Sequence, residues 1–557
     1  MPVFFVRKRI RLVFSLYFEY TLTDPGLSPL QKETERTEIT MKTFDAVVVG
    51  AGNAGLSAAL RLQNAGRKTL LIEQHNLPGG CATSFVRGRF EFEPSLHELC
   101  DVGTEENPGE VRKLFEEYGV KLDWAQCPDC FRFVSKYSDG TPMDVTMPHG
   151  IDAFVAKMEE YVPGSKDKMY ELFDIYEEIR QGANYTSACN GKADPKVMQE
   201  KYPNMLRLGA YPTSRVFKAM KLPQRCQDIL STYWGYLGVD LNHLSFFHYA
   251  SMMQRYVSMG AAIPQHTSHE ISMAMLNRFY ELGGEAWFNC RAEEFLFDEE
   301  GGLKGVRTTL GDVATTMCLP NINPDIIYAK MMPKELVPER EKKLVAARGQ
   351  DFSARMFCAY FGLDCDYHEL GITNYTYFIG GSADSESEYH KILGPWQGNE
   401  FAIFNCLNVV LPDCSPKGTC ICSITTFGSK EDWDNVSQED YAGLKEKVTE
   451  HILEMVKDKL GIDISGHIEE ISIASPWTFA RYLNAPEGAV YGYEARDWDG
   501  IMARMMMLKQ DYPIKGLRPI GAAGPRGDGY SGAYITGNLL GKLALADLKN
   551  WEEEGKK

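Results

Sequence analysis

The feature that most constrains this chain is a glycine triplet between a short apolar strand and a helix. The β-rich run 44–49 is followed by Gly50-Ala51-Gly52-Asn53-Ala54-Gly55, and residues 56–62 then show the apolar spacing of a helix. A second β-rich run, 69–72, ends at Glu73. A lone triplet would be weak evidence, but here strand, triplet, helix, second strand and acid follow one another within about thirty residues. This order predicts a Rossmann-like unit that binds a dinucleotide.

Each part of the motif has a physical role. Gly50 permits the tight turn, Gly52 lets the backbone approach a pyrophosphate, and Gly55 lets the helix pack closely on the strand. The helix that follows presents unpaired N–H groups and the positive end of its dipole to the phosphates. A carboxylate at Glu73 can accept hydrogen bonds from the ribose hydroxyls. We therefore expect the dinucleotide to contact Gly50, Gly52, Asn53, Ala54, Gly55 and Glu73.

Composition excludes several classes of protein. The chain has 557 residues, of which 44% are hydrophobic, so it can bury a sizeable core and wholesale disorder is excluded. The net charge of −17 is spread along the chain, which argues against a nucleic-acid partner. The longest charge-free stretch, 46–60, is interrupted by glycines and is too short to cross a membrane. The fourteen cysteines form no disulfide framework, so we expect free thiols in the cytoplasm and no metal site.

Residues 1–40 differ from the rest. Arg7, Lys8, Arg9 and Arg11 precede a short apolar run, 12–18. Three interpretations compete: an interfacial anchor that gives peripheral membrane contact, a targeting segment, or sequence upstream of the true start. We favour the last and expect an N-terminal extension outside the fold, which then begins at about residue 41.

The segment that follows Glu73 resembles part of a known protein family, and this resemblance indicates which dinucleotide the chain binds. Pro78-Gly79-Gly80-Cys81-Ala82-Thr83-Ser84 and the run Gly88 to His97 are similar to a turn and hairpin of the FAD-containing phytoene desaturase, carotenoid isomerase and retinol saturase family. Ser95 stands where that family usually has glycine. The resemblance implies that Gly79, Gly80, Thr83 and Ser84 contact FAD. It also places His97 beside the flavin ring, where imidazole can exchange a proton.

The far end of the chain carries a second glycine-rich motif. Gly527, Gly529 and Gly532 precede an apolar helix, but too few residues follow for another βαβ unit. The motif resembles the family's closing loop, which meets the flavin at a helix N-terminus. A segment around Ala292 is similar to the family strand whose backbone contacts the adenine. The resemblance thus adds these cofactor contacts: Ala292, Gly521, Asp528, Gly529, Tyr530, Ser531 and Gly532.

The resemblance implies an α/β flavoenzyme of two domains. A discontinuous, Rossmann-like (GR-type) FAD-binding domain is expected from 41–120, 250–330 and 471–557, with an inserted α+β substrate domain from 121–249 and 331–470. The implied activity is desaturation, saturation or cis/trans isomerisation of carbon–carbon double bonds in an apolar polyene, isoprenoid or other unsaturated lipid, with His97 as the acid/base. The electron partner stays open.

Other classes overlap with these motifs. Flavin amine oxidases and protoporphyrinogen oxidases share the two-ended FAD architecture and remain the main alternative. A flavin-binding protein without enzymatic activity is a second alternative. Flavin disulfide reductases are rejected, because Cys81 has no cysteine at the required spacing.

Overall fold

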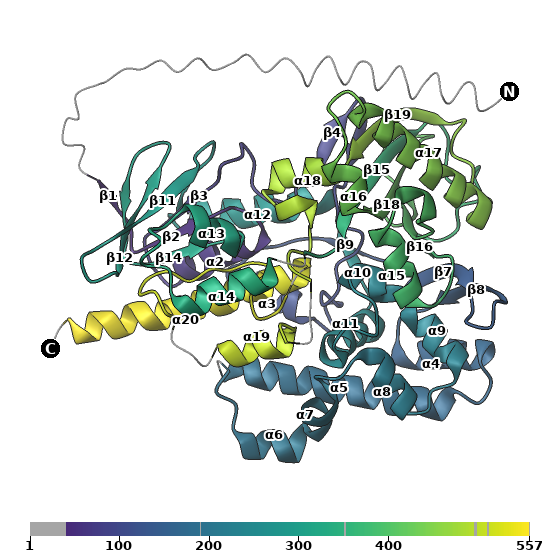
Figure 1. Ribbon diagram of the computed structural model, residues 1–557, viewed down its shortest axis with the longest axis horizontal. Coiled ribbons are helices and arrows are strands. Elements are labelled where there is room, and N and C mark those ends of the chain that lie inside the picture. Colours follow the sequence, from purple (N-terminus) through teal and green to yellow (C-terminus); the bar gives the residue numbers. More distant parts are fainter. Residues whose placement is uncertain are drawn as a thin grey trace.

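The computed structural model describes residues 41–189, 191–349, 352–494, 498–508, 512–527 and 529–555. The segment 1–40, with its three interpretations, and Asp528 lie outside the described residues. Figure 1 shows two lobes, one around β2 and β3 and the other around β15 and β18, with a group of helices below the second lobe.

The first lobe is built on a parallel sheet in which both faces are covered. Its strand order is β10-β3-β2-β14, and every neighbouring pair is parallel. On β2, Val47 packs into one hydrophobic cluster with Leu70, and Val48 packs into the opposite cluster with Leu71. Alternate residues of an extended strand point to opposite faces, which explains the unbroken apolar run. The strands are β2 (Ala46–Val49), β3 (Thr69–Ile72), β10 (Glu285–Trp287) and β14 (Cys318–Pro320).

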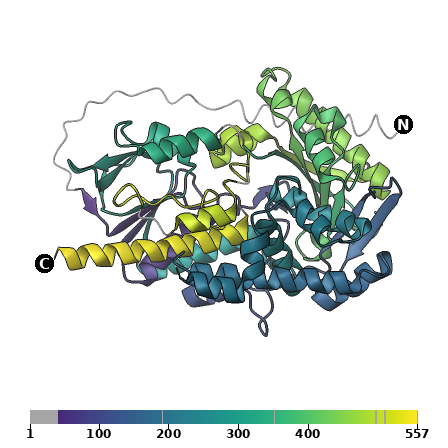
Figure 2. The same ribbon diagram turned by 60° about the horizontal axis from the view of Figure 1, so that its bottom comes forward.

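Helices cover one face of this sheet, and a small second sheet lies beyond the other. The central helix α2 packs on α20, where a Cβ at Gly537 would come within 2.2 Å of the Ala54 carbonyl oxygen. Figure 2 follows α20 along its length to the C-terminus. The helices on this face are α2 (Asn53–Asn64), α3 (Glu110–Tyr118), α12 (Thr267–Glu281) and α20 (Tyr530–Glu554). On the other side lie α13 (Pro324–Lys330), α14 (Glu339–Arg348) and the small sheet of β1 (Lys42–Thr43), β11 (Ala292–Phe297), β12 (Leu303–Thr308) and β13 (Val313–Ala314).

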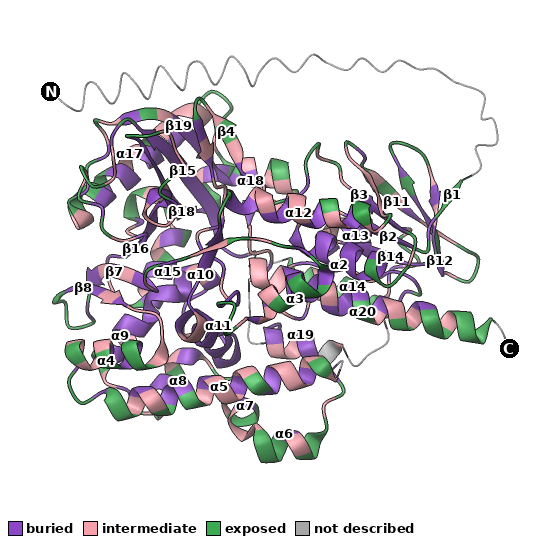
Figure 3. Cartoon of the chain, turned by 180° about the vertical axis from the view of Figure 1, so that it is seen from behind, coloured by how far each residue is buried: buried purple, intermediate pink, exposed green. Residues whose placement is uncertain are grey.

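The second lobe contains a seven-stranded mixed sheet of order β19-β15-β18-β17-β16-β7-β8. All its pairs are antiparallel except β16 with β7. Figure 3 shows the central strands of this sheet as buried, in contrast to the exposed helix α6. The strands are β7 (Phe131–Lys136), β8 (Pro142–Met147), β15 (Arg355–Leu363), β16 (Thr376–Ile379), β17 (Ala402–Cys406), β18 (Cys420–Gly428) and β19 (Ile468–Ala474).

Helices pack on both sides of the second sheet. α17 (Tyr441–Leu460) contributes Val448 and Ile452 to the cluster on one face, and a larger cluster on the other face includes residues of α5 and α11. The helices of this lobe are α4 (Ile151–Tyr161), α5 (Lys166–Ala188), α6 (Pro195–Lys201), α7 (Pro203–Leu208), α8 (Thr213–Ala219), α9 (Gln224–Leu230), α10 (Trp234–Leu237), α11 (Phe246–Met259), α15 (Ser385–Leu393) and α16 (Lys430–Asp434).

Several short elements complete the structure. They are the hairpin of β4 (Phe85–Arg87) and β5 (Phe90–Phe92), the pair β6 (Trp124–Gln126) and β9 (Ala262–Pro264), the helices α18 (Pro476–Leu483) and α19 (Ile501–Met507), and the 3-10 turns η1 (Ser231–Tyr233), η2 (Trp396–Gly398), η3 (Leu407–Val409) and η4 (Pro486–Gly488).

The α/β class and the Rossmann-like unit expected from the sequence are confirmed by this topology. Segments from 41–120, 250–330 and 471–557 meet in the first lobe, while the domain boundaries themselves stay predictions. Among the described residues, no helix combines the length and the apolarity needed to cross a membrane.

Candidate cofactor and substrate cavity

A cavity of about 880 Å³ is lined by residues of both lobes. The first glycine-rich loop, the end of β3, the exit of the β4–β5 hairpin and the closing loop before α20 all contribute to its wall. Parallel sheets commonly bind ligands at the carboxyl ends of their strands, and β2 and β3 both end at this cavity.

The first glycine-rich loop is held in a tight turn beside the cavity. Gly50 has a φ of +94°, which favours glycine, and the Ala51 N–H donates to the Glu73 carboxylate over 2.6 Å. A Cβ at Gly55 would lie 1.8 Å from the Gly50 carbonyl oxygen, so only glycine allows the first turn of α2 to pack there. The buried side-chain oxygen of Asn53 has no protein partner. That oxygen is an acceptor and calls for a donor, whereas the backbone N–H groups at this helix N-terminus face a space that fits an anion.

Glu73 follows β3 and lines the same cavity. One of its oxygens accepts the Ala51 N–H and the other accepts the His75 N–H over 2.8 Å. These two bonds fix the carboxylate at the end of the strand. Each oxygen retains a further lone pair for a ligand hydroxyl.

The second predicted segment lies directly against the first loop. The Gly79 N–H donates to the Ala51 carbonyl over 2.8 Å, and Gly79 and Gly80 both have positive φ and line the cavity. Thr83 instead donates to the Pro78 carbonyl over 3.0 Å, and Ser84 donates to the Glu91 carboxylate over 2.5 Å. Thr83, Ser84 and Gly55 support the loop and are not among the described residues that line the cavity, so their contact with a cofactor stays a prediction.

The closing loop reaches across the cavity to that segment. The Tyr530 hydroxyl donates to the Cys81 carbonyl over 2.7 Å, and the Ser531 hydroxyl donates to the Cys100 carbonyl over 2.7 Å. Ser95 contacts the Tyr530 hydroxyl at 3.0 Å. The serine that replaces the family's usual glycine therefore ties the hairpin to the closing loop.

The remaining predicted contacts also meet here. The described residues that line the cavity include Ala292 at the start of β11, Gly521, Gly529, Tyr530, Ser531 and Gly532. Asn321, which the sequence analysis did not single out, lies between the two glycine-rich loops: its side chain would lie within 3.0 Å of a Cβ at Gly52 and within 2.6 Å of a Cβ at Gly521. Its place in an Asn-x-Asn-Pro turn after β14 was the available signal.

His97 lies where the cavity meets the second lobe. Its Nε2 is 3.0 Å from the Thr425 hydroxyl, and its carbonyl accepts a hydrogen bond from Tyr375. Burial lowers the pKa of His97 to about 4, so the imidazole is neutral at neutral pH. Nearby, burial raises the pKa of Glu93 to about 7, although the backbone N–H and hydroxyl of Ser268 donate to its carboxylate over 2.8 and 2.6 Å.

Glu98, which follows His97 directly in the sequence, is a further functional candidate. It lines the cavity, and both carboxyl oxygens are buried without a hydrogen-bond partner. Burial, followed by the charge of Asp129, raises its pKa well above the ordinary value. Burial therefore favours the protonated form of Glu98, and an unpaired buried acid is a group whose position calls for a functional explanation.

A buried ion network borders the cavity next to the closing loop. Arg255 donates to Asp101 over 3.0 Å, and Arg526 donates to Glu110 over 2.6 Å. Asp101, Arg255 and Arg526 line the cavity. These partners are far apart in sequence, so no local pattern indicates the network.

The wall contributed by the second lobe is largely apolar and aromatic. Leu237, Phe247, Met252, Met356 and Tyr491 line the cavity together with Tyr236, whose ring centroid is 5.7 Å from that of His97. The sequence left open whether such side chains line a tunnel or form a core. Both occur: Trp234, Phe246 and Met253 are buried in the core cluster behind this wall.

Comparison with known proteins agrees with this architecture. The sequence model of the NAD(P)-binding Rossmann-like domain matches residues 48–118. All-trans-retinol 13,14-reductase of Homo sapiens is 24% identical over 537 residues, covering 91% of this chain and 87% of that protein. Prolycopene isomerase 2 of an Oncidium hybrid cultivar is 22% identical, covering 91% and 84%. The 1-hydroxycarotenoid 3,4-desaturase of a Flavobacterium species is 23% identical, covering 80% and 88%.

Solved structures share the fold. An oxidoreductase from Methanosarcina mazei has a TM-score of 0.60 at 13% identity, covering 89% of this chain and 99% of that chain. Wild-type putrescine oxidase has a TM-score of 0.58 at 14% identity, covering 90% and 99%. The chain is thus similar over most of its length to a retinol 13,14-reductase, a prolycopene isomerase and a carotenoid desaturase, and it shares its overall fold with putrescine oxidase.

Proposed function

We propose that this protein is an FAD-dependent enzyme that desaturates, saturates or isomerises carbon–carbon double bonds of an apolar polyene or isoprenoid-like lipid. One observation carries the proposal. A single cavity joins two glycine-rich loops, two helix N-termini and a strand-end glutamate to a histidine, a buried unpaired glutamate and an apolar wall. The names of the homologous reductase, isomerase and desaturase support the polyene class.

The residues present fit FAD. The N–H groups of the Gly50–Gly55 loop suit the pyrophosphate, and Glu73 suits the ribose. Gly79, Gly80 and the closing loop from Gly521 to Gly532 would hold the remainder. When bound there, FAD supplies the hydride chemistry, which no amino-acid side chain can provide.

The chain itself supplies the proton. Because burial raises the pKa of Glu98 and favours its protonated form, Glu98 can donate a proton to a substrate carbon and take it back in the reverse direction. His97 is neutral and positioned by Thr425, so it can accept a proton but holds none to give as an imidazolium. We assign the acid role to Glu98 and the orienting or base role to His97.

The apolar wall of the cavity indicates an apolar substrate. Leu237, Phe247, Met252 and Met356 offer dispersion contacts along this wall. An apolar polyene gains free energy by leaving water for such a surface.

The test identifies the cofactor and separates the two enzyme classes. Denaturation of the purified yellow protein should release FAD, identified by mass spectrometry, and a panel of primary and polyamines should generate no peroxide. A colourless protein that FAD cannot reconstitute would remove the cofactor assignment. Peroxide formed from an amine would favour the amine oxidase alternative.

A further inference from the structure

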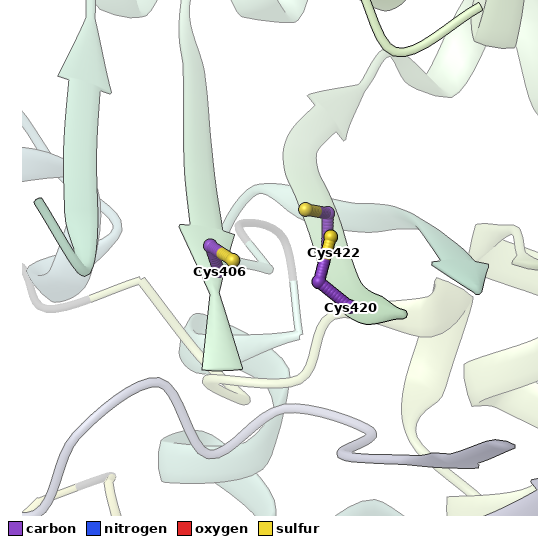
Figure 4. A group of neighbouring side chains, drawn as sticks. All are labelled: Cys406, Cys420 and Cys422. Atoms are coloured by element: carbon purple, nitrogen blue, oxygen red, sulfur yellow. The ribbon is translucent and has the colours of Figure 1, made fainter. Parts of the chain in front are cut away.

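Three buried cysteines form a cluster away from the cavity described above. Cys406 ends β17, while Cys420 and Cys422 lie near the start of β18 (Figure 4). Cys406 pairs directly with Cys422 across the two antiparallel strands. Cys420 lies two residues before Cys422, so the strand period places both side chains on the same face of the sheet. The register therefore brings three thiols to one spot.

The geometry of the cluster suits a metal ion. The three sulfur atoms all lie within 4.8 Å of one another, and each residue is 0% exposed. Around an ion with metal–sulfur bonds of ~2.3 Å, three sulfurs in one plane stand about 4 Å apart. The sulfurs would move inward by less than about 1 Å to reach that spacing.

The ligand set selects a soft ion. Among the described residues, no fourth histidine, cysteine or carboxylate atom joins the group within the same distances. Structural Zn²⁺ sites almost always have four ligands, and full burial keeps water from taking the fourth position. Thiolates also favour soft ions such as Cu(I) over Mg²⁺, Ca²⁺ or Mn²⁺. We propose that Cys406, Cys420 and Cys422 form a three-coordinate site for one Cu(I) ion.

The site is independent of the flavin chemistry. It lies on the face of the seven-stranded sheet that packs under α17, in the cluster that includes Ile452 and Val456. No member of the trio lines the large cavity. The sequence predicts only free thiols for the fourteen cysteines, because Cys406 joins Cys420 and Cys422 only through the pairing of β17 with β18.

The experiment measures Cu(I) uptake by the flavin-loaded protein without oxygen. Cu(I) is supplied as its coloured bicinchoninate complex, and the protein should remove one equivalent of metal from the chelator. The variant Cys406→Ala/Cys422→Ala should lose that equivalent. The matched control is Cys358→Ala, because Cys358 is equally buried in the neighbouring strand β15 but belongs to the cluster on the opposite face. The control should bind as the wild type does.

A second measurement does not depend on variants that fold. Copper K-edge X-ray absorption of the loaded wild-type protein should show three sulfur neighbours and no oxygen or nitrogen neighbour. Absence of uptake, equal uptake by the double variant, or a copper shell of oxygen and nitrogen would each overturn the proposal. Uptake of one Zn²⁺ in place of Cu(I) would overturn the assignment of the ion.

Discussion

Replacing Gly55 by alanine should damage both the fold and the cofactor site, although alanine is the better helix former. Gly55 is the third residue of α2, and the new Cβ would lie 1.8 Å from the Gly50 carbonyl oxygen and 3.0 Å from its carbonyl carbon. Restoring ordinary contact requires the loop and the helix to separate by roughly 1.5 Å. Alanine would otherwise gain about 1 kcal/mol over glycine in a helix interior. Overpacking costs typically ~1–3 kcal/mol, which exceeds that gain.

The displaced loop carries the N–H groups that we assign to the pyrophosphate, so flavin content should fall together with stability. The matched control is Gly443→Ala, because Gly443 is the third residue of α17 and has nothing within 4 Å of its added Cβ. The assay is the flavin-to-protein absorbance ratio after gel filtration, combined with the free energy of unfolding in urea. The reasoning is refuted if Gly55→Ala keeps full flavin content and is as stable as the control.

Three further changes follow from the site. Glu98→Gln should keep the flavin but slow turnover by ~10²–10⁴-fold. The wild-type rate should fall as pH rises through the elevated pKa of Glu98. A variant with the wild-type rate and pH profile would show that Glu98 is not the acid. Ser95→Ala removes the hydrogen bond with the Tyr530 hydroxyl and should lower the free energy of unfolding by about 1 kcal/mol. An unchanged midpoint of urea unfolding would contradict a stabilising role for this hydrogen bond. Burial, with the charges of Arg504 and Arg255, lowers the pKa of His248 to about 3. In the unfolded chain the pKa of His248 is near 6.5, so the unfolded state binds a proton that the folded state does not, and stability is lost as pH falls from 6.5 towards 3. Between pH 7 and 5 this loss in the free energy of unfolding is about 2 kcal/mol. His248→Gln should lack the loss when urea unfolding is measured at each pH.

The sequence predicted the structure well where the contacts join residues that are close together in the chain. The strand, the loop and the first turn of α2 are adjacent in the chain, and the contact between Gly55 and Gly50 leaves no other residue type at that position. The glycine spacing therefore predicted the fold of this unit directly. The closing loop was predicted only through its resemblance to a family, because its contacts with Cys81 and Cys100 join distant segments.

Long-range pairing limited the remaining predictions. The strand β7 pairs with β16, more than two hundred residues away, and no periodicity in either strand indicates that partner. Glu98 is unusual because of what surrounds it in three dimensions: both oxygens are buried without a partner, while the sequence shows only an acid beside a histidine. The trio of cysteines depends in the same way on the register of β17 with β18.

The most direct test of the central claim is the fate of an apolar polyene mixed with the flavin-loaded protein without oxygen. A panel of retinoids, carotenoids and shorter isoprenoid polyenes is followed by the flavin spectrum, by chromatography and by mass spectrometry. We expect at least one polyene either to gain or lose two hydrogens together with a change in flavin redox state, or to keep its mass and change its double-bond geometry. We expect Glu98→Gln to slow that conversion. Recovery of every polyene unchanged, with either the oxidised or the pre-reduced flavin, while an amine bleaches the flavin would contradict the account.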